Sequence, residues 1–522
     1  MFQSKVVNPI IRGFNPDPNI LKVGEHYYVI VSSFEWLPGI RVYESTDLIN
    51  WEHKTDILTD QVSLKGNPIN GSIWAPQISY SDGRFYLVYT DVKSVARPFK
   101  DAHNYMMSAT NIEGPWENPI YLNSSGFDPS LFHDPRTGKK WLLNERWDFR
   151  LATPNKSAGI IIQEYDPKQK QMIGPVHMIF PGTELAKTEA PHLYYINDYY
   201  YLLTAEGGTG SGHAVTVCRS RDLLGPYEVD PQNPMLTARG YPTSTLQCAG
   251  HASLVQTEFN SWYMVHLCTR PIEGSAILGR ETAIQEVYWT EDGWLRIKEG
   301  GNQPKEIVVI PTKEKVIQKI IPRFFDDFKG AMNKRWNARR CMPDRTWCDL
   351  TSRDGYLRMI AGESPQSTFD QHLLAIRQTA FSFVAQTQLE YQPSHFNQMA
   401  GLLLFLNEEN YYYCCVTWDE EVGKCLRVLS AVEGHVTISA DTYPLTEKET
   451  ILKVVVEGTS GQFYVKGSQS WEKVGARIDV QTLSGGFTGN FVGIGVHDLA
   501  LKGGSYADFA YFDYQENEIK ER

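Results

Sequence analysis

Short apolar runs rich in aromatic and β-branched residues recur along the first part of the chain, and each is bounded by glycine, proline, asparagine or aspartate. Runs of this kind are typical of β-strands separated by tight turns. No long stretch repeats its apolar residues with the 3.6-residue period of an amphipathic helix. The pattern therefore predicts an all-β protein.

Five of these runs resemble one another and are regularly spaced. They are His26–Val31, Arg84–Tyr89, Lys140–Asn144, Asp198–Leu203 and Ser261–His266. Measured between Tyr28, Tyr86, Trp141, Tyr200 and Tyr263, the steps are 58, 55, 59 and 63 residues. A third signature follows three of the runs and is expected to form the turn and outer strand of those units. It comprises Ser45–Trp51, Ser108–Trp116 and Ser220–Tyr227. Five similar units of this length predict a five-bladed β-propeller over residues 1–310.

A second signature lies 10 to 13 residues before each of these reference residues. It begins at Asp17, Ala75, Asp128, Ala190 and His251, and in four of the five cases its second residue is proline, which suits the start of a strand. The first strand of each propeller blade lines the central channel, so these matching positions should converge on one end of it. Because Glu189 directly precedes Ala190, the repeat predicts three carboxylates and one imidazole in a single cavity.

A different β pattern follows the propeller. The blade signal fades after Gly293, and residues 299–322 resemble a linker. Strand-like runs such as Ile451–Val456, Gly461–Lys466 and Ala507–Phe512 then predict a lectin-like β-sandwich over residues 323–522. The glycine-rich segment Gly485–Gly489 is either a tight turn between strands or a loop that extends out of the sheet.

Charge and composition restrict the partners of the protein. Lys and Arg number 50 against 61 Asp and Glu, which gives a net charge of -11 without a basic block. This balance argues against nucleic acid and against an anionic membrane surface. No apolar stretch reaches the ~18 residues of a membrane-spanning helix. The first residues do not resemble a signal peptide, and the 8 cysteines are too few for a disulfide scaffold, so we expect a cytoplasmic protein with reduced core cysteines.

Hydrolysis of a glycosidic bond requires two carboxyl groups in different protonation states. One must stay protonated to donate to the leaving oxygen, and one must stay ionised to activate water. Aromatic side chains near the signatures (Phe34, Trp36, Trp74 and Trp147) would supply apolar faces for sugar rings, and Arg280 would supply hydrogen-bond donors. Each residue also has a structural alternative, since aspartate before proline is common in turns and tryptophan is common in cores.

Several ordered segments resemble glycoside hydrolase family 43, and most closely its two-domain β-xylosidases. The resemblance covers nearly the whole chain and is carried by Asn15–Ile20, Ser72–Ser79, Ser125–Asp134, Thr188–Tyr194, Ala205–Thr209, Gly250–Val255 and Leu278–Gln285, together with the start of the second domain at Asp326 and the Gly485–Gly489 loop.

The resemblance implies a role for each predicted site residue. Asp17 corresponds to the general base, Glu189 to the general acid, and Asp128 to a third carboxylate that keeps the pKa of the acid high. The positions that correspond to the sugar pocket are Phe34, Trp74, Trp147, Thr209, His251, Arg280 and Phe487. His251 matches an axial histidine, and Phe487 matches an aromatic residue that the second domain contributes to close the pocket.

The activity implied is exo-acting, inverting release of xylose from the non-reducing end of β-1,4-xylo-oligosaccharides. The alternatives are α-L-arabinofuranosidase activity, alone or in addition, and a non-catalytic sugar-binding propeller. Ala190, Ser72, Ala276 and the short segment Arg270–Ala276 depart from the pattern of relatives at positions expected near the pocket, so the balance between xyloside and arabinofuranoside stays open.

The resemblance implies no required cofactor and no catalytic metal. It leaves open a calcium ion near the propeller axis or in the sandwich domain, where Asp508 and the Asp326-Asp327 pair are the acidic candidates. The sequence also leaves open whether the protein forms a homo-oligomer.

Overall fold

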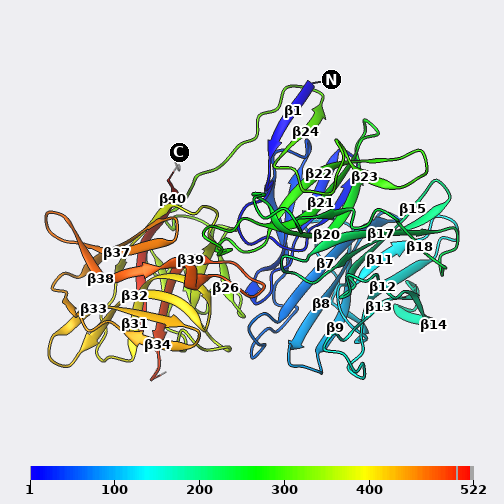
Figure 1. Cartoon of the computed structure of the whole chain (residues 1–522). Coiled ribbons are helices and arrows are strands. Elements are labelled where there is room, and N and C mark those ends of the chain that lie inside the picture. The colour runs from blue at the N-terminus through cyan, green and yellow to red at the C-terminus, as the bar shows by residue number, and fades with distance from the viewer. Residues whose placement is uncertain (1, 501–503, 518–522) are drawn as a thin grey trace.

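The computed structural model describes residues 2–500 and 504–517, and two β-rich parts lie side by side in it (Figure 1). The propeller is drawn in blue to green and the sandwich in yellow to red. Among the described residues the one helical element is a short 3-10 helix, η1 (Val480–Leu483). No helix in these residues has the length and apolar character needed to cross a membrane.

Residues 19–297 form five antiparallel sheets, each built around four strands that follow one another in the chain, except that β4 (Trp36–Leu37) intervenes in the first blade without joining its sheet, so the predicted five-bladed propeller is confirmed. The innermost strands are β2 (Asn19–Val23), β7 (Ser72–Ser81), β11 (Ser130–His133), β15 (Glu189–Ile196) and β20 (Gln247–Gln256). The second strands are β3 (His26–Ile30), β8 (Arg84–Ser94), β12 (Lys140–Trp147), β16 (Tyr199–Glu206) and β21 (Trp262–Thr269), and they contain the five repeated aromatic runs.

The third and fourth strands complete each blade. The third strands are β5 (Gly39–Ser45), β9 (Asp101–Ala109), β13 (Ser157–Asp166), β17 (Ala214–Ser220) and β22 (Glu281–Trp289). The outer strands are β6 (Glu52–Leu58), β10 (Ile120–Asn123), β14 (Gln171–Phe180), β18 (Glu228–Val229) and β23 (Leu295–Ile297), with β19 (Leu236–Thr237) also paired to β17. The third signature begins at the last residue of a third strand or just before it, and it forms mainly the turn to the outer strand.

Both ends of the propeller segment pair with each other. β24 (Ile307–Thr312) is antiparallel to β1 (Phe2–Val7). The segment expected to be a linker therefore contains a strand, and the connection without strands runs from 313 to 322. An isolated bridge between Ile11 and Thr282 further ties the N-terminal segment to the last blade.

The second part is a sandwich of two antiparallel sheets in the described residues. One contains β27 (Cys348–Asp349), β28 (Leu357–Ile360), β40 (Tyr506–Glu516), β30 (Phe383–Glu390), β36 (Glu449–Glu457), β37 (Ser460–Lys466), β38 (Trp471–Asp479) and, on β40, β25 (Arg323–Asp326). The other contains β34 (His435–Ile438), β33 (Gly423–Val432), β32 (Asn410–Asp419), β31 (Gln398–Asn407), β39 (Phe491–Asp498), β29 (Leu373–Arg377), β26 (Asn337–Arg339), β4 (Trp36–Leu37) and, on β33, β35 (Tyr443–Pro444).

Burial alternates residue by residue along β30 and β36, because one face of their sheet covers the core and the other faces solvent. The eight cysteines are all unpaired, and seven are buried.

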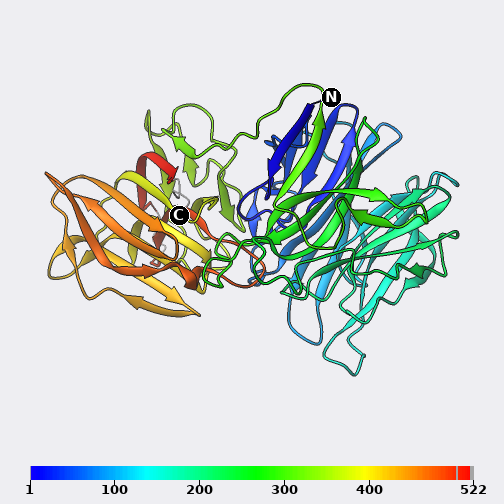
Figure 2. The same cartoon turned by 45° about the horizontal axis from the view of Figure 1, so that its top comes forward.

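The two parts share one sheet and one apolar cluster. β4 is a propeller segment, yet it pairs with β26 at the edge of the sandwich. Trp36 on β4 is fully buried and stacks on Phe491, with ring centroids 3.8 Å apart. The expectation that Trp36 offers a face to a sugar is therefore wrong, since it packs against the sandwich. In Figures 1 and 2 the orange-red segment before β39 extends from the sandwich to the propeller.

Candidate active site

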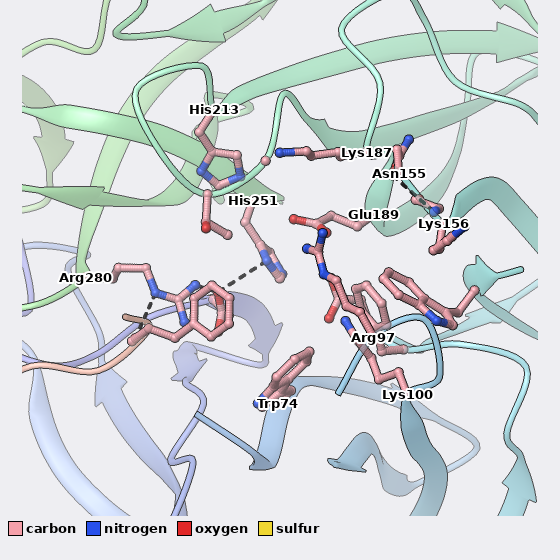
Figure 3. A pocket seen from close by; sticks show the side chains of 18 of the residues that line it. Trp74, Arg97, Lys100, Asn155, Lys156, Lys187, Glu189, His213, His251 and Arg280 are labelled. Carbon is pink, nitrogen blue, oxygen red and sulfur yellow. Dashed lines mark hydrogen bonds and ion pairs between the residues drawn. The ribbon is translucent and has the colours of Figure 1, made fainter. Parts of the chain in front are cut away.

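A cavity of about 310 Å³ opens between the inner strands of the propeller and the loop from the sandwich. Figure 3 shows side chains from several elements that point into it, among them Trp74, Lys100, Glu189, His251 and Arg280. Every residue to which the family resemblance gave a site role lines this cavity, whereas Trp36 does not; the full set is Asp17, Phe34, Trp74, Asp128, Trp147, Glu189, Thr209, His251, Arg280 and Phe487.

A shared backbone feature brings the matching positions of the five blades together. Asp17, Ala75, Asp128, Ala190 and His251 all have left-handed backbone conformations, with φ between 40 and 55°. In three blades the pairing register also shifts beside this residue. A bulge of this kind re-aims a side chain out of the regular alternation of the strand. Such backbone strain is concentrated at functional sites in proteins, and here it recurs with the blade repeat.

The Asp17 carboxylate is buried and held by three neighbours. Arg280 Nη1 lies 2.7 Å from Asp17 Oδ1, and Ser32 Oγ donates to Oδ2 at 2.6 Å. His251 Nδ1 lies 3.4 Å from Oδ1. Burial acts to raise the pKa of Asp17, but the positive charge of Arg280 and the contacts with His251 and Ser32 outweigh it and hold the pKa below its ordinary value. Asp17 is therefore ionised at neutral pH.

Glu189 and Asp128 have the opposite electrostatic character. Burial is the largest cause that raises the pKa of Glu189 to about 7, and the Asp17 charge adds to it while Lys100 opposes it. Burial and the neighbouring Glu189 likewise raise the pKa of Asp128 well above its ordinary value. A site with one ionised carboxylate and two carboxyl groups whose pKa values are raised meets the requirement for simultaneous base and acid chemistry.

Two neutral histidines form part of the cavity lining beside Asp17. Burial lowers the pKa of His251 to about 4, and it also lowers the pKa of His213 to about 3. The His213 ring lies against Gly250, where an added Cβ would come within 2.5 Å of the ring. Gly250 is therefore required for this close packing. His213 Nδ1 lies 3.1 Å from the Cys248 carbonyl oxygen, which sets the orientation of the ring.

Aromatic rings make up one wall of the cavity and enclose a lysine. Trp74 lies 5.7 Å from Phe127, and Phe127 lies 6.0 Å from Trp147, between ring centroids. The Lys100 ammonium group lies 4.1 Å from the centroids of both Phe127 and Trp147. Contacts of this type stabilise a cation in a partly desolvated position. Burial nevertheless lowers the pKa of Lys100, although the nearby carboxylates oppose this.

The opposite wall depends on the sandwich loop. Arg280 Nε donates to the Phe487 carbonyl oxygen at 3.1 Å, and the Phe487 amide donates to Asn70 Oδ1 at 2.9 Å. The Phe487 ring then lies near Phe34 and Trp74, with centroids 6.2 and 5.8 Å away. Gly486 has φ +67 and approaches the Asn70 side chain so closely that a Cβ would lie 2.8 Å from it. The loop therefore extends out of the sandwich, which decides between the two interpretations of the glycine-rich segment.

Several cavity residues were not identified from the sequence. Lys100 and Arg97 lie in the loop between β8 and β9, outside the repeated signatures, and Lys187 and His213 also fall outside them. Phe127 could have been identified from the sequence, because it directly precedes Asp128. Ala75 occupies a matching position but does not line the cavity; its amide donates to Ser32 Oγ at 2.7 Å.

The four departures from the family pattern differ in their position. Ala190 and Ser72 have φ of 52 and 65°, so glycine would relieve strain at both positions. Ser72 and Ala276 do not line the cavity. In the segment 270–276, the Glu273 carboxylate accepts hydrogen bonds from Thr459 and Gln481 of the sandwich. Ala190 and the segment 270–276 are likewise outside the cavity lining, although Ala190 directly follows Glu189, so none of the four departures expected at the pocket or its rim contributes a lining residue.

The acidic residues considered for calcium are bound by protein donors. Arg358 donates to both oxygens of Asp508, at 2.7 and 2.8 Å, and Arg353 lies 3.3 Å from one of them. Asp326 accepts from the Phe328 amide and from Trp336 Nε1. Two guanidinium groups beside Asp508 do not fit a calcium ion there. A cation near the propeller axis stays a prediction.

Comparison with known proteins assigns the family. Residues 6–295 match the model of glycosyl hydrolases family 43. This chain belongs to glycoside hydrolase family 43. Residues 325–515 match a β-xylosidase C-terminal concanavalin A-like domain, in agreement with the observed sandwich.

Relatives of this family 43 member align with it over nearly the whole length of both chains. The chain is 41% identical to a β-xylosidase of Bacillus subtilis, covering 98% of this chain and 100% of the relative. It is 42% identical to xylosidase/arabinosidase 43B of Humicola insolens, covering 98% of both. The crystal structure of a xylan β-1,4-xylosidase from Bacillus halodurans superposes with a TM-score of 0.95 at 47% identity, covering 98% of this chain and 100% of that structure.

Proposed function

We propose that this protein is an exo-acting, inverting β-xylosidase that releases xylose from the non-reducing end of β-1,4-xylo-oligosaccharides. The observation that carries the proposal is the single cavity into which Asp17, Asp128 and Glu189 open, with the pKa of Asp17 lowered and that of Glu189 raised to about 7. The names of the full-length relatives support xylosides as the substrate class.

In the proposed reaction, Asp17 and Glu189 act on the same glycosidic bond in one displacement. Asp17 accepts a proton from a water molecule as the water oxygen attacks the anomeric carbon. Glu189 donates its proton to the glycosidic oxygen as the bond to the leaving sugar breaks. Asp17 ends protonated and Glu189 ionised, and proton exchange with solvent restores both. Inversion requires room for the water, so the two carboxyl groups should lie roughly 6.5–9.5 Å apart.

The other cavity residues bind and orient the sugar. Arg280 both fixes the Asp17 carboxylate and anchors Phe487, so one side chain couples the base to the cavity wall. Phe34, Trp74 and Phe487 surround the sugar with apolar surface. With this wall closed by the sandwich loop, the cavity accepts the end of a chain, which supports exo action. Because protein side chains supply both proton transfers, we propose that no cofactor is required.

The second candidate activity is hydrolysis of α-L-arabinofuranosides. The name of the Humicola insolens relative, xylosidase/arabinosidase, favours it as an additional activity. Initial rates on 4-nitrophenyl β-D-xyloside and 4-nitrophenyl α-L-arabinofuranoside at equal concentration distinguish the two. We expect the xyloside to be the better substrate, and a ratio that favours the arabinofuranoside would contradict the first assignment.

The Glu189→Gln variant tests the proposed acid. We expect kcat for xylobiose to fall by about 10²- to 10⁴-fold with little change in KM, because the amide cannot donate a proton to the leaving oxygen. The loss should be smaller for a nitrophenyl xyloside, whose leaving group needs less protonation. Glu184→Gln is the matched control, since Glu184 is exposed in the loop that precedes β15 and does not line the cavity. Unchanged turnover of Glu189→Gln would refute the assignment.

A further inference from the structure

Two phenylalanines are exposed beside the mouth of the catalytic cavity and touch each other. Phe99 is 61% exposed and Phe149 is 50% exposed. Their ring centroids are 5.1 Å apart, with an angle of 56° between the planes. The two residues belong to different blades, Phe99 to the loop between β8 and β9 and Phe149 to the loop between β12 and β13. An apolar pair exposed to this degree has no role in packing a core.

The pair is continuous with the cavity lining. Arg97 and Lys100, on either side of Phe99 in the chain, both line the cavity. Trp147 lies two residues before Phe149, and its Nε1 donates to the Pro98 carbonyl oxygen at 2.9 Å. The same two loops therefore carry the cavity wall and the exposed rings.

The turn that carries Phe149 is fixed by hydrogen bonds. The Asp148 carboxylate accepts from the Arg150 amide at 3.1 Å and from Arg150 Nε at 2.8 Å. The Asp148 amide donates to the Lys156 carbonyl oxygen at 2.8 Å, and the Leu151 amide donates to the Asp148 carbonyl oxygen at 3.2 Å. A ligand that packs on a fixed ring loses less free energy to ordering of the protein than one that binds a mobile loop.

The cavity mouth also carries polar donors within these loops. Arg97, Asn155 and Lys156 line the cavity; among the described residues neither Arg97 nor Lys156 forms an ion pair, and Lys156 Nζ donates one hydrogen bond to the Leu151 carbonyl oxygen. Guanidinium, amide and ammonium groups donate hydrogen bonds to sugar hydroxyls, while aromatic rings pack against the apolar C–H faces of a pyranose. Exposed rings and donors together form a surface suited to a neutral oligosaccharide.

We propose that Phe99 and Phe149 form a leaving-group subsite that binds the second sugar beyond the bond to be cleaved. The proposal rests on the proposed β-xylosidase function and names the substrate class more closely: chains of three or more xylose units. In the cavity, the terminal xylose fills the space near Asp17 and Glu189, and the first leaving-group sugar lies by Trp147 and Lys100. The next sugar then reaches the exposed rings.

The test compares kcat/KM for xylobiose and xylotriose, measured as xylose release. In the wild-type protein we expect the trisaccharide to be hydrolysed more efficiently than the disaccharide. In Phe99→Ala/Phe149→Ala we expect the ratio of the two kcat/KM values to fall about fivefold, because one sugar loses its apolar platform. Phe396→Ala is the matched control, since Phe396 is 62% exposed on the sandwich and far from the lining residues in sequence. A thermal unfolding curve for each variant verifies that it is folded.

The outcomes separate the subsite from the proposed function. If the wild type hydrolyses xylobiose but gains nothing from the third sugar, or if the double variant keeps the wild-type ratio, the subsite is overturned and the β-xylosidase function stands. If no β-xyloside of any length is hydrolysed, both are overturned. A reduced ratio in the double variant, with an unchanged ratio in Phe396→Ala, supports the subsite.

Discussion

Replacement of Arg280 by methionine should move the acidic limb of the pH–rate profile. Arg280 Nη1 lies 2.7 Å from Asp17 Oδ1, and both side chains are buried. This positive charge is the largest influence that lowers the pKa of Asp17, while burial acts in the opposite direction. Without Arg280, burial is left largely uncompensated and the pKa of Asp17 rises. The base must be ionised, so activity should be lost at a higher pH than in the wild type.

The size of the shift follows from the charge separation. Two unit charges about 4 Å apart attract by about 4 kcal/mol at an effective dielectric constant of about 20, which is about three pKa units. Cavity water screens part of this attraction, and aspartates beside arginine show shifts of about one to three units. We therefore expect the acidic limb of kcat/KM to move upward by about one to three pH units.

The assay is kcat/KM for 4-nitrophenyl β-D-xyloside across the acidic range, with tryptophan fluorescence at each pH to verify that the protein is folded. Arg280 also contacts Phe487, so the variant should lose activity at every pH. The position of the limb, unlike its height, reports the ionisation of Asp17. Arg280→Lys keeps the charge and should shift the limb less. An unmoved limb in Arg280→Met would refute the electrostatic role of this residue.

Three further outcomes follow from the site and the interface. Activity should decline as the pH rises through about 7, because Glu189 has a pKa of about 7 and must be protonated; a constant kcat/KM up to pH 9 would contradict its role as the acid. Asn70→Ala removes the acceptor for the Phe487 amide and should raise KM for xylobiose about fivefold, measured against an unchanged melting temperature. Buried Arg339 of the sandwich contacts buried Glu35 of the propeller at 3.1 Å and buried Glu408 at 2.8 Å, and Glu408 also pairs with Arg340. Arg339→Met therefore leaves Glu35 without an ion-pair partner and should lower the free energy of unfolding in urea by about 3–5 kcal/mol; a loss below 1 kcal/mol would show that this cluster does not hold the two parts together.

The sequence was sufficient to predict the propeller and the three carboxylates that share the cavity because both depend on the repeat. Each blade contributes one inner strand, and the matching positions share a left-handed conformation, so residues far apart in the chain, such as Asp17 and Asp128, reach the same cavity. Without such a repeat, the sequence does not indicate which distant residues lie close together, because the conformations of the loops between them are unknown.

Features that depend on loops and on contacts between the two parts could not be predicted in this way. Lys100 lies in a loop between the second and third strands of its blade, outside the repeated signatures, and its position depends on the rings of Phe127 and Trp147. Trp36 is an aromatic residue of the kind that binds sugars, but β4 pairs with the sandwich, so the Trp36 side chain lies in the interface between the two parts. β24 was not recognised because its partner, β1, lies some 300 residues earlier in the chain.

The most direct test of the central claim is the anomeric form of the first product. Proton NMR of xylobiose hydrolysis resolves the α- and β-anomers of xylose before mutarotation brings them to equilibrium. If Asp17 activates water on one face of the sugar while Glu189 protonates the leaving oxygen on the other, the xylose released from the non-reducing end appears first as the α-anomer. Initial release of β-xylose would contradict a single displacement between these two carboxyl groups.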